Sequence, residues 1–328
     1  MKIVDGVVGL EAGVAAVLQR ALAIFSQDPD DDFAQLHAAL SSRQRDGLFL
    51  LVDGQPCGLA TWQYEDEARH FAAVELLFID AGVSDPAVEM LVDGLWARLM
   101  ADPALDMIAL RVHDVSDVVR AALLGQGVTI FERHMMTCDL LGWSAPADAA
   151  NGAYQVVGWT DEHQAGVEAL APLAQKGNID EIVVPDAQAD RMVTSIRKIR
   201  AGTYPNVGPF IAAASLVVLD AGGNVAGYLA AVDMGMLPFI SEVAVHPDHR
   251  RRGLGRLLVE HSMAALREQR FPLVGLVVTG GNPALKLYEK LGFHTIQVGE
   301  MAVWWRDGRQ QRWHDERQQR WRDGRQQS

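Results

Sequence analysis

Arginine and glycine residues gather at one point of the sequence, residues 250–256 (Arg-Arg-Arg-Gly-Leu-Gly-Arg). The preceding residues 239–245 are apolar, rich in β-branched side chains and followed by His246-Pro247, which predicts a strand. Residues 254–268 carry apolar side chains at helical spacing. Arginines oppose the dipole at the start of a helix, but the unpaired N–H groups and the glycines there suit a phosphate. The sequence therefore predicts a polyphosphate site, with a solvated basic loop as the alternative.

A second strand, a glycine turn and a short helix follow this loop. Residues 273–279 predict the strand, and residues 284–291, closed by Gly292, predict the helix. The combination of Arg250-x-x-Gly253-x-Gly255 with Asn282-Pro283-Ala284 and Leu-Tyr-Glu-Lys-Leu-Gly-Phe at 287–293 resembles the GNAT superfamily of acetyl-CoA-dependent N-acyltransferases. The glycine motif alone is a weak signal, whereas the two segments together at this spacing are specific.

The resemblance implies an α/β (α+β) fold in which a mixed, mostly antiparallel sheet is flanked by helices. It also implies acetyl-CoA as cosubstrate and no metal. The main-chain N–H groups of residues 251–256 would take the pyrophosphate, and residues 243–245 would pair with the pantetheine arm on a strand that splays from its neighbour. The implied cofactor-binding residues are Val243, Ala244, Val245, Arg250, Arg251, Arg252, Gly253, Leu254, Gly255, Arg256 and Asn282.

Acetylation of an amine also needs a neutral nucleophile and a proton for the departing thiolate. An alkyl ammonium with a pKa near 10.4 is neutral in only about one molecule in two thousand at pH 7, which costs about 4.6 kcal/mol. Glu242 is the candidate general base, directly or through water, unless it is an outward-facing strand carboxylate. The resemblance makes Tyr288 the general acid, and the alternative for Tyr288 is an aromatic residue of the core.

The order of predicted elements repeats, which indicates an internal duplication. In the first half we expect helices at 9–25, 33–43, 86–100 and 117–124, and strands at 48–52, 57–64, 71–79, 107–112 and 135–140. In the second half we expect helices at 161–174, 187–200, 254–268 and 284–291, and strands at 154–159, 209–219, 225–232, 239–245, 273–279 and 295–304.

This repetition predicts two tandem GNAT-like domains, of which the first is degenerate. Residues 82–86, Gly-Val-Ser-Asp-Pro, put an acid where the second copy has its arginines, and Ala122 or Leu123 stands in the place of Tyr288. We expect a degenerate domain at 1–145, a linker at 146–153, the catalytic domain at 154–304 and a low-complexity tail at 305–328. An unrelated α/β domain is the alternative for the first half.

Composition limits the partners and the compartment. The net charge of −13 argues against general affinity for nucleic acid or acidic membranes. Residues 1–150 hold 23 acidic and 9 basic residues, which leaves 19 and 20 for the remainder, so the acidic half could favour a cationic substrate or serve solubility. Two cysteines without metal-ligand spacing, no signal-peptide pattern and no apolar run of membrane-spanning length predict a cytoplasmic protein.

The predicted activity is N-acetyl transfer from acetyl-CoA to a small-molecule or peptide amine, in a protein that could form a homodimer. Two other readings stay open: a non-catalytic sensor that binds acyl-CoA, and an acyltransferase that uses another acyl-CoA. Residues 175–190 lie where acceptor loops are expected but carry no recognisable code. The tail repeats an eight-residue unit from Trp305, Trp313 and Trp321, and we expect little fixed structure and no chemistry there.

Overall fold

The computed structural model of the protein describes residues 1–6, 11–25, 29–42, 44–65, 67–112, 116–144, 153–204, 207–313 and 315. Of the expected linker at 146–153, only Ala153 is among them, and most of the expected tail beyond residue 313 lies outside them. The chain divides into two compact units. Unit 1 comprises Met1–Phe131 with the chain from Glu300 onward, and unit 2 comprises Glu132–Gly299.

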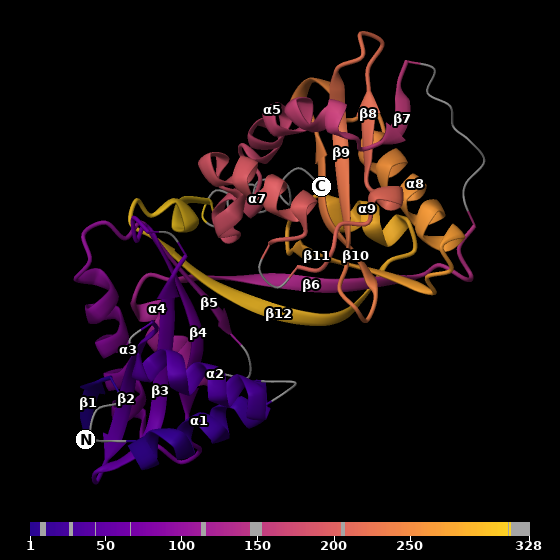
Figure 1. Ribbon diagram of the computed structural model, residues 1–328. Coiled ribbons are helices and arrows are strands. Elements are labelled where there is room, and N and C mark those ends of the chain that lie inside the picture. The colour runs from indigo at the N-terminus through magenta and orange to yellow at the C-terminus, as the bar shows by residue number, and fades with distance from the viewer. Residues whose placement is uncertain are drawn as a thin grey trace, which may run out of the picture. The chain divides into compact units, whose positions relative to one another are not determined.

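Unit 1 is a sheet covered by helices on both faces (Figure 1). Its strands follow the order β1-β2-β3-β4-β5-β12, and only β4 and β5 pair in parallel. Helices α1 and α2 pack on one face around a core that includes Leu18 and Phe49, and α3 and α4 pack on the other around Leu95 and Trp62. The bounds are β1 Lys2–Asp5, α1 Glu11–Phe25, α2 Pro29–Ser41, β2 Asp46–Val52, β3 Gln55–Tyr64, β4 Phe71–Ile79, α3 Asp85–Met100, β5 Met107–Val112, α4 Asp117–Gly125 and β12 His294–Trp305.

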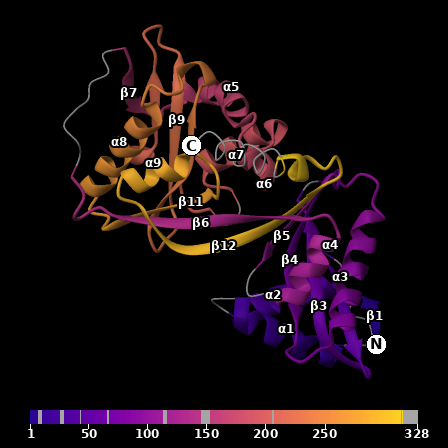
Figure 2. The ribbon, with the colours of Figure 1, turned by 180° about the vertical axis from the view of Figure 1, so that it is seen from behind.

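Unit 2 repeats this plan with the order β6-β11-β10-β9-β8-β7, in which β10 and β11 form the parallel pair. Helices α5 and α7 cover one face, and α8 and α9 cover the other (Figure 2). The bounds are β6 Thr129–Asp139, β7 Gln155–Gly158, α5 Gln164–Gln175, α6 Asp180–Val183, α7 Ala189–Ala201, β8 Leu216–Leu219, β9 Val225–Asp233, β10 Pro238–Val245, α8 Leu254–Glu268, β11 Leu273–Thr279 and α9 Ala284–Lys290. The expected fold class, two mixed and mostly antiparallel sheets flanked by helices, is confirmed.

Each unit takes its last strand from the other half of the sequence. Strand β6 pairs with β11, from Leu273↔Asp139 to Thr279↔Arg133, so the magenta strand of Figure 1 lies beside the orange strands of unit 2. Residues Glu300–Trp305 of β12 pair with β5 in unit 1. We expected 135–140 to close the first domain and 295–304 to close the second, and these pairings are wrong although both strands exist. The alternation of apolar residues in a strand indicates which of its faces is buried and not which sheet it joins.

The remaining differences from the expected elements are local. The expected strand at 209–219 is shortened to β8, because residues Ala212–Ala214 form a 3-10 turn and Phe210 makes only an isolated bridge to Val232. Strand β1 and helix α6 were not expected.

The first repeat of the tail is ordered. Arg309 lies over the Trp305 ring at 4.2 Å, and Gln310 Nε2 donates to the Gly127 carbonyl at 3.2 Å. Trp313 packs against Phe131 with ring centroids 5.8 Å apart. Residues 305–313 are therefore part of unit 1, which the repetitive composition did not indicate.

No helix among the described residues is both long enough and apolar enough to cross a membrane.

Candidate active site

Strands β10 and β11 pair only at their start. The parallel register covers Phe239↔Gly275 and Ile240↔Leu276, whereas β10 stays paired with β9 as far as Val245↔Gly227. The register with β9 shifts between Ile240 and Glu242, which marks a β-bulge at Ser241. Residues 242–245 therefore have a strand partner on one side only within the described chain. Main-chain N–H and C=O groups on the other side are available to an extended ligand, as the resemblance requires for the pantetheine arm.

The loop at 250–256 has the backbone that anion binding needs. Arg251 and Gly253 have positive φ, at 63° and 81°, and Gly253 is the N-cap residue of α8 without any side-chain cap. The first N–H groups of α8 are thus left for a ligand. A Cβ atom at Gly255 would lie 3.7 Å from Leu287 and 3.9 Å from Val245, so this glycine faces the space between β10 and α9.

Two of the arginines in this loop fix its position. Arg250 Nη2 donates to the carbonyl of Ala174 at 2.6 Å, which ties the loop to the end of α5. Arg252 Nη1 donates to the Tyr154 hydroxyl at 3.1 Å, and that hydroxyl lies 2.9 Å from His249 Nδ1. The loop is therefore braced by protein contacts, and not only suited to phosphate by its charge.

Glu242 points beneath the helices and not outward. In the register with β9, Glu242 lies opposite Ala230 and Ala244 lies opposite Tyr228, and these neighbours belong to the core under α5 and α7. Gln175 Nε2 of α5 donates to Glu242 Oε1 at 2.8 Å. Burial, and then the Asp180 charge, raise the pKa of Glu242 to about 8 against the opposing effect of the Gln175 hydrogen bond. Solvent still reaches part of the residue, so proton exchange is open to it.

Tyr288 comes from α9 on the opposite face. Its side chain is 8% exposed and packs against Phe293, with ring centroids 5.8 Å apart. Burial raises its pKa well above the usual phenol value, and the charges of Glu242 and Asp180 raise it further. Tyr288 and Glu242 thus lie within electrostatic reach of each other, which fits the opening where β10 and β11 part.

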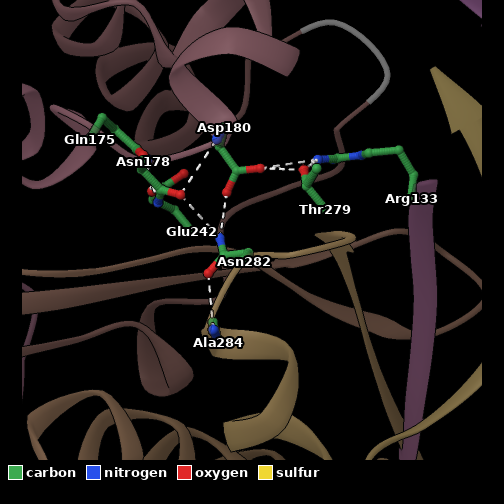
Figure 3. A network of polar contacts seen from close by, with 8 residues as sticks. All are labelled: Arg133, Gln175, Asn178, Asp180, Glu242, Thr279, Asn282 and Ala284. Atoms are coloured by element: carbon green, nitrogen blue, oxygen red, sulfur yellow. Dashed lines mark hydrogen bonds and ion pairs between the residues drawn. The ribbon is translucent and has the colours of Figure 1, made fainter. Parts of the chain in front are cut away.

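Asn282 is part of a polar network that the sequence did not indicate (Figure 3). Its Oδ1 accepts from the Ala284 main-chain N at 2.9 Å, and its Nδ2 donates to Asp180 Oδ2 at 2.8 Å. The other members are Arg133, Gln175, Asn178, Asp180 and Thr279. Single polar residues of a connecting segment leave no pattern in a sequence, so nothing could have singled these out beyond the polarity of residues 175–180.

Tyr228 is a second functional candidate that was missed. Its hydroxyl is fully buried and has no hydrogen-bond partner in the described chain. Burial, and then the Glu242 charge, raise its pKa well above the usual value. Such an orphaned hydroxyl on the same face as Glu242 is placed to meet a ligand or a water molecule.

The described part of unit 1 has other residues at the corresponding positions. Strand β4 is followed by Asp80 and a short turn to α3, whose first turn contains Asp85, and Arg20 pairs with Asp80 through two contacts of 2.7 Å. The bulge of β4 falls at Glu75, which therefore corresponds to Ser241 and not to Glu242. Counted from the end of α4, buried Leu123 occupies the place of Tyr288.

The described residues contain no cluster of three or more side chains that could hold a metal ion.

Part of the chain matches a known protein family and its members. Residues 212–295 match the family described as acetyltransferase (GNAT) domain. The [ribosomal protein bS18]-alanine N-acetyltransferase of Escherichia coli K12 is 38% identical over 69 residues, which are 21% of this chain and 47% of that protein. Its counterpart from Salmonella typhimurium is 45% identical over 53 residues, which are 16% of this chain and 36% of that protein. This chain thus spans about half the length of the curated relatives it matches.

Solved structures match over nearly the whole chain. A GCN5-related N-acetyltransferase from Sphaerobacter thermophilus has a TM-score of 0.58 at 14% identity, with 92% of this chain and 95% of that chain covered. A tandem GNAT protein from the clavulanic acid biosynthesis pathway has a TM-score of 0.54 at 16% identity, with 93% and 98% covered. Residues 212–295 therefore match the GNAT acetyltransferase family, and the fold of the chain is similar to that of a tandem GNAT protein.

Proposed function

We propose that the protein is an acetyl-CoA-dependent N-acetyltransferase that acts on a primary amine by direct attack, with its active centre in unit 2. The observation that carries this proposal is the placement of Glu242 and Tyr288 at the opening between β10 and β11. One is a carboxyl group with a pKa of about 8, and the other is a buried phenol whose pKa is raised well above its usual value.

The residues present fit acetyl-CoA. The unpaired side of residues 242–245 would hold the pantetheine arm, and the uncapped start of α8 after Gly253 would hold the pyrophosphate. Asn282 lies in the turn before α9, where members of the GNAT superfamily contact their cofactor. Acetyl-CoA would supply the activated acetyl group, and coenzyme A would leave as the free thiol.

Glu242 is suited to take the proton of the acceptor. Transfer from an ammonium of pKa about 10.4 to a carboxyl at the ordinary value of 4.5 costs about 8 kcal/mol, and transfer to a carboxyl near 8 costs only about 3 kcal/mol. The raised pKa therefore removes a large part of the cost of making the amine neutral. The same value keeps most of Glu242 protonated at pH 7, so the rate should rise with pH up to about 8.

Tyr288 is suited to return a proton to the thiolate. Its high pKa means that it loses the proton only to a strong base, which the thiolate becomes as the bond to the acetyl group breaks. Burial excludes water that would compete for this role. After turnover, a proton must pass back to Tyr288 from solvent or from the Glu242 side.

The test is turnover. Purified protein is incubated with acetyl-CoA and a panel of amines, and free thiol is measured. The panel includes peptides with an N-terminal alanine, because the Escherichia coli relative is named for that acceptor, and small diamines, because the site holds two carboxyl groups. Amine-dependent release of thiol supports the enzyme. Binding of acetyl-CoA without release of thiol with any amine would support the sensor reading instead.

A parallel assay with succinyl-CoA addresses the acyl group. We further propose that unit 1 is a degenerate GNAT-like copy without a cofactor of its own and that the protein works in the cytoplasm.

A further inference from the structure

Asp180, the first residue of α6, accepts hydrogen bonds from three elements that are distant in sequence. Asn282 Nδ2, in the turn before α9, donates to Oδ2 at 2.8 Å. Arg133 Nη1 of β6 donates to Oδ1 at 3.3 Å, and the Thr279 hydroxyl at the end of β11 donates to the same oxygen. Both carboxylate oxygens are thus satisfied, and Asp180 is largely shielded from solvent. A carboxylate whose two oxygens both accept hydrogen bonds from the protein is better suited to fixing its neighbours than to binding a ligand.

The contacts continue from Asp180 to Glu242 (Figure 3). Asn178 Oδ1 accepts from the Asp180 main-chain N and from Asn282 Nδ2, each at 3.4 Å. Asn178 Nδ2 donates to Gln175 Oε1 at 3.4 Å, and Gln175 Nε2 donates to Glu242 Oε1 at 2.8 Å. One end of the chain of contacts is therefore Arg133 on a strand from the first half of the sequence, and the other end is the candidate base.

We propose that Asp180 is a positioning residue of this centre, which holds residues 175–183 over Glu242 and keeps a negative charge beside it, with Arg133 as the counter-ion. The proposal rests on the proposed function in so far as Glu242 is the base. It extends that function by assigning a role to Arg133, so that β6 contributes to the centre and does more than complete the sheet.

The charged and titratable groups around Glu242 predict in which direction each substitution shifts the ionisation of Glu242. Asp180 faces Glu242 from α6, Tyr228 from β9 and Tyr288 from α9, and Gln175 of α5 is uncharged. Arg133 faces Asp180 from β6. Loss of the Asp180 charge should make Glu242 easier to ionise. Loss of Arg133 should leave the Asp180 charge less compensated and make Glu242 harder to ionise.

The first experiment titrates Glu242 without any substrate. The full-length protein is labelled with ¹³C at the glutamate carboxyl groups, and the Glu242 signal is identified by its absence in Glu242→Gln. In Asp180→Asn we expect its midpoint to fall by about one pH unit, and in Arg133→Gln we expect it to rise by about half a unit. Glu181→Gln, which removes a charge from the same helix, is the matched control because Glu181 binds the Gly177 N–H and is not among the groups that shift Glu242.

Opposite shifts in the two variants support the proposal. Midpoints that stay in place, or that move in the same direction in both variants, would overturn it, because a merely structural contact has no reason to separate the signs. If Asp180→Asn fails to fold, Arg133→Gln alone still decides the question by the direction of its shift. Arg133→Lys should return the midpoint most of the way towards the wild-type value. The lysine restores the positive charge but not the planar set of N–H donors of the guanidinium.

The second experiment follows turnover. The acid limb of kcat/KM for the amine should move in the same directions as the midpoints, and kcat/KM at pH 9 should fall about tenfold in both variants because residues 175–183 lose their anchor. If no amine is acetylated while the titrations behave as expected, the proposed function fails and the positioning role stands. If amines are acetylated and both the limb and the midpoints are unmoved, the positioning role fails and the enzyme stands.

Discussion

Gln175 Nε2 donates a hydrogen bond of 2.8 Å to Glu242 Oε1 from the last residue of α5. This bond favours the charged carboxylate, whereas burial and the neighbouring Asp180 favour the neutral acid. The balance leaves Glu242 with a pKa of about 8. A group in this state can accept a proton in one half of a cycle and release it in the other.

The pH dependence of turnover should report on Glu242. In the wild type, kcat/KM for the amine should rise with pH and level off above about 8. Glu242→Gln should lower kcat/KM by about 10²–10⁴ and abolish this limb. Rates are measured by free-thiol release from pH 6 to 10. Glu268→Gln, at the exposed end of α8, serves as the control, and a limb that survives in Glu242→Gln would assign it to another group.

Stability should also depend on the charge of Glu242. The unfolded carboxyl loses its proton near its ordinary pKa of 4.5, while the folded one keeps it until about 8, so between these values the folded state binds more protons. Stability from this group is complete below the unfolded pKa and is lost as pH rises through the folded pKa. Relative to wild type, Glu242→Gln should therefore gain stability from pH 5 to pH 9, by up to roughly 5 kcal/mol. Thermal melts without ligand test this, and a Tm difference independent of pH would contradict it.

Tyr288→Phe separates acid catalysis from packing. The ring and its contact with Phe293 remain and only the hydroxyl is lost, so Tm should change little. kcat should fall by about 10²–10⁴ with little change in acetyl-CoA affinity. The fall should be smaller with a cofactor analogue whose thiol is more acidic. An unchanged kcat at saturating amine would leave Tyr288 as a core residue.

Gly255→Glu tests the phosphate loop. A Cβ atom at Gly255 meets only ordinary contacts, so the variant should fold, but its carboxylate would enter the space between β10 and α9 and repel the pyrophosphate. Calorimetry should show at least a hundredfold loss of acetyl-CoA affinity, which is about 2.7 kcal/mol. Gly158→Glu on β7, where an added Cβ meets nothing within 4 Å, is the control with the same change of charge. Normal affinity in folded Gly255→Glu would remove the loop from the cofactor site.

The number of cofactor sites tests the degeneracy of unit 1. The Arg20–Asp80 pair and the acidic first turn of α3 stand where unit 2 has its loop at 250–256, so an anionic ligand is disfavoured there. Titration of the wild type with acetyl-CoA should give one site per chain. Two sites of similar affinity would show that unit 1 retains a cofactor site by other means.

The sequence was most informative where short segments decide the structure. The loop at 250–256, Glu242 and Tyr288 lie on contiguous elements whose pattern is local, and the structure has these elements close to their expected bounds. The face of Glu242 could not be predicted, because the bulge at Ser241 changes the alternation of side chains along β10. A bulge at Glu75 interrupts the alternation along β4 in the same way.

Contacts between residues far apart in the sequence could not be predicted from the sequence. Asp180 and Arg133 are joined across 47 positions of the chain, and neither belongs to a motif. Asp180 is the first residue of a four-residue helix, which is too short to show a periodic pattern in the sequence. The partners of β6 and β12 are residues far away in the sequence, and the pattern of a strand does not indicate which sheet it joins.

The crossing of β6 and β12 has a consequence for biosynthesis. A ribosome releases strands β1 to β5 first, yet the partner of β5 on its second edge in the described chain is the segment at residues 300–305. Until those residues emerge, the nascent unit carries an open, apolar strand edge, the kind of surface on which partly made chains associate. Contacts of such wide sequence separation also slow folding. The half of the protein that is synthesised first is therefore the half that must be completed last.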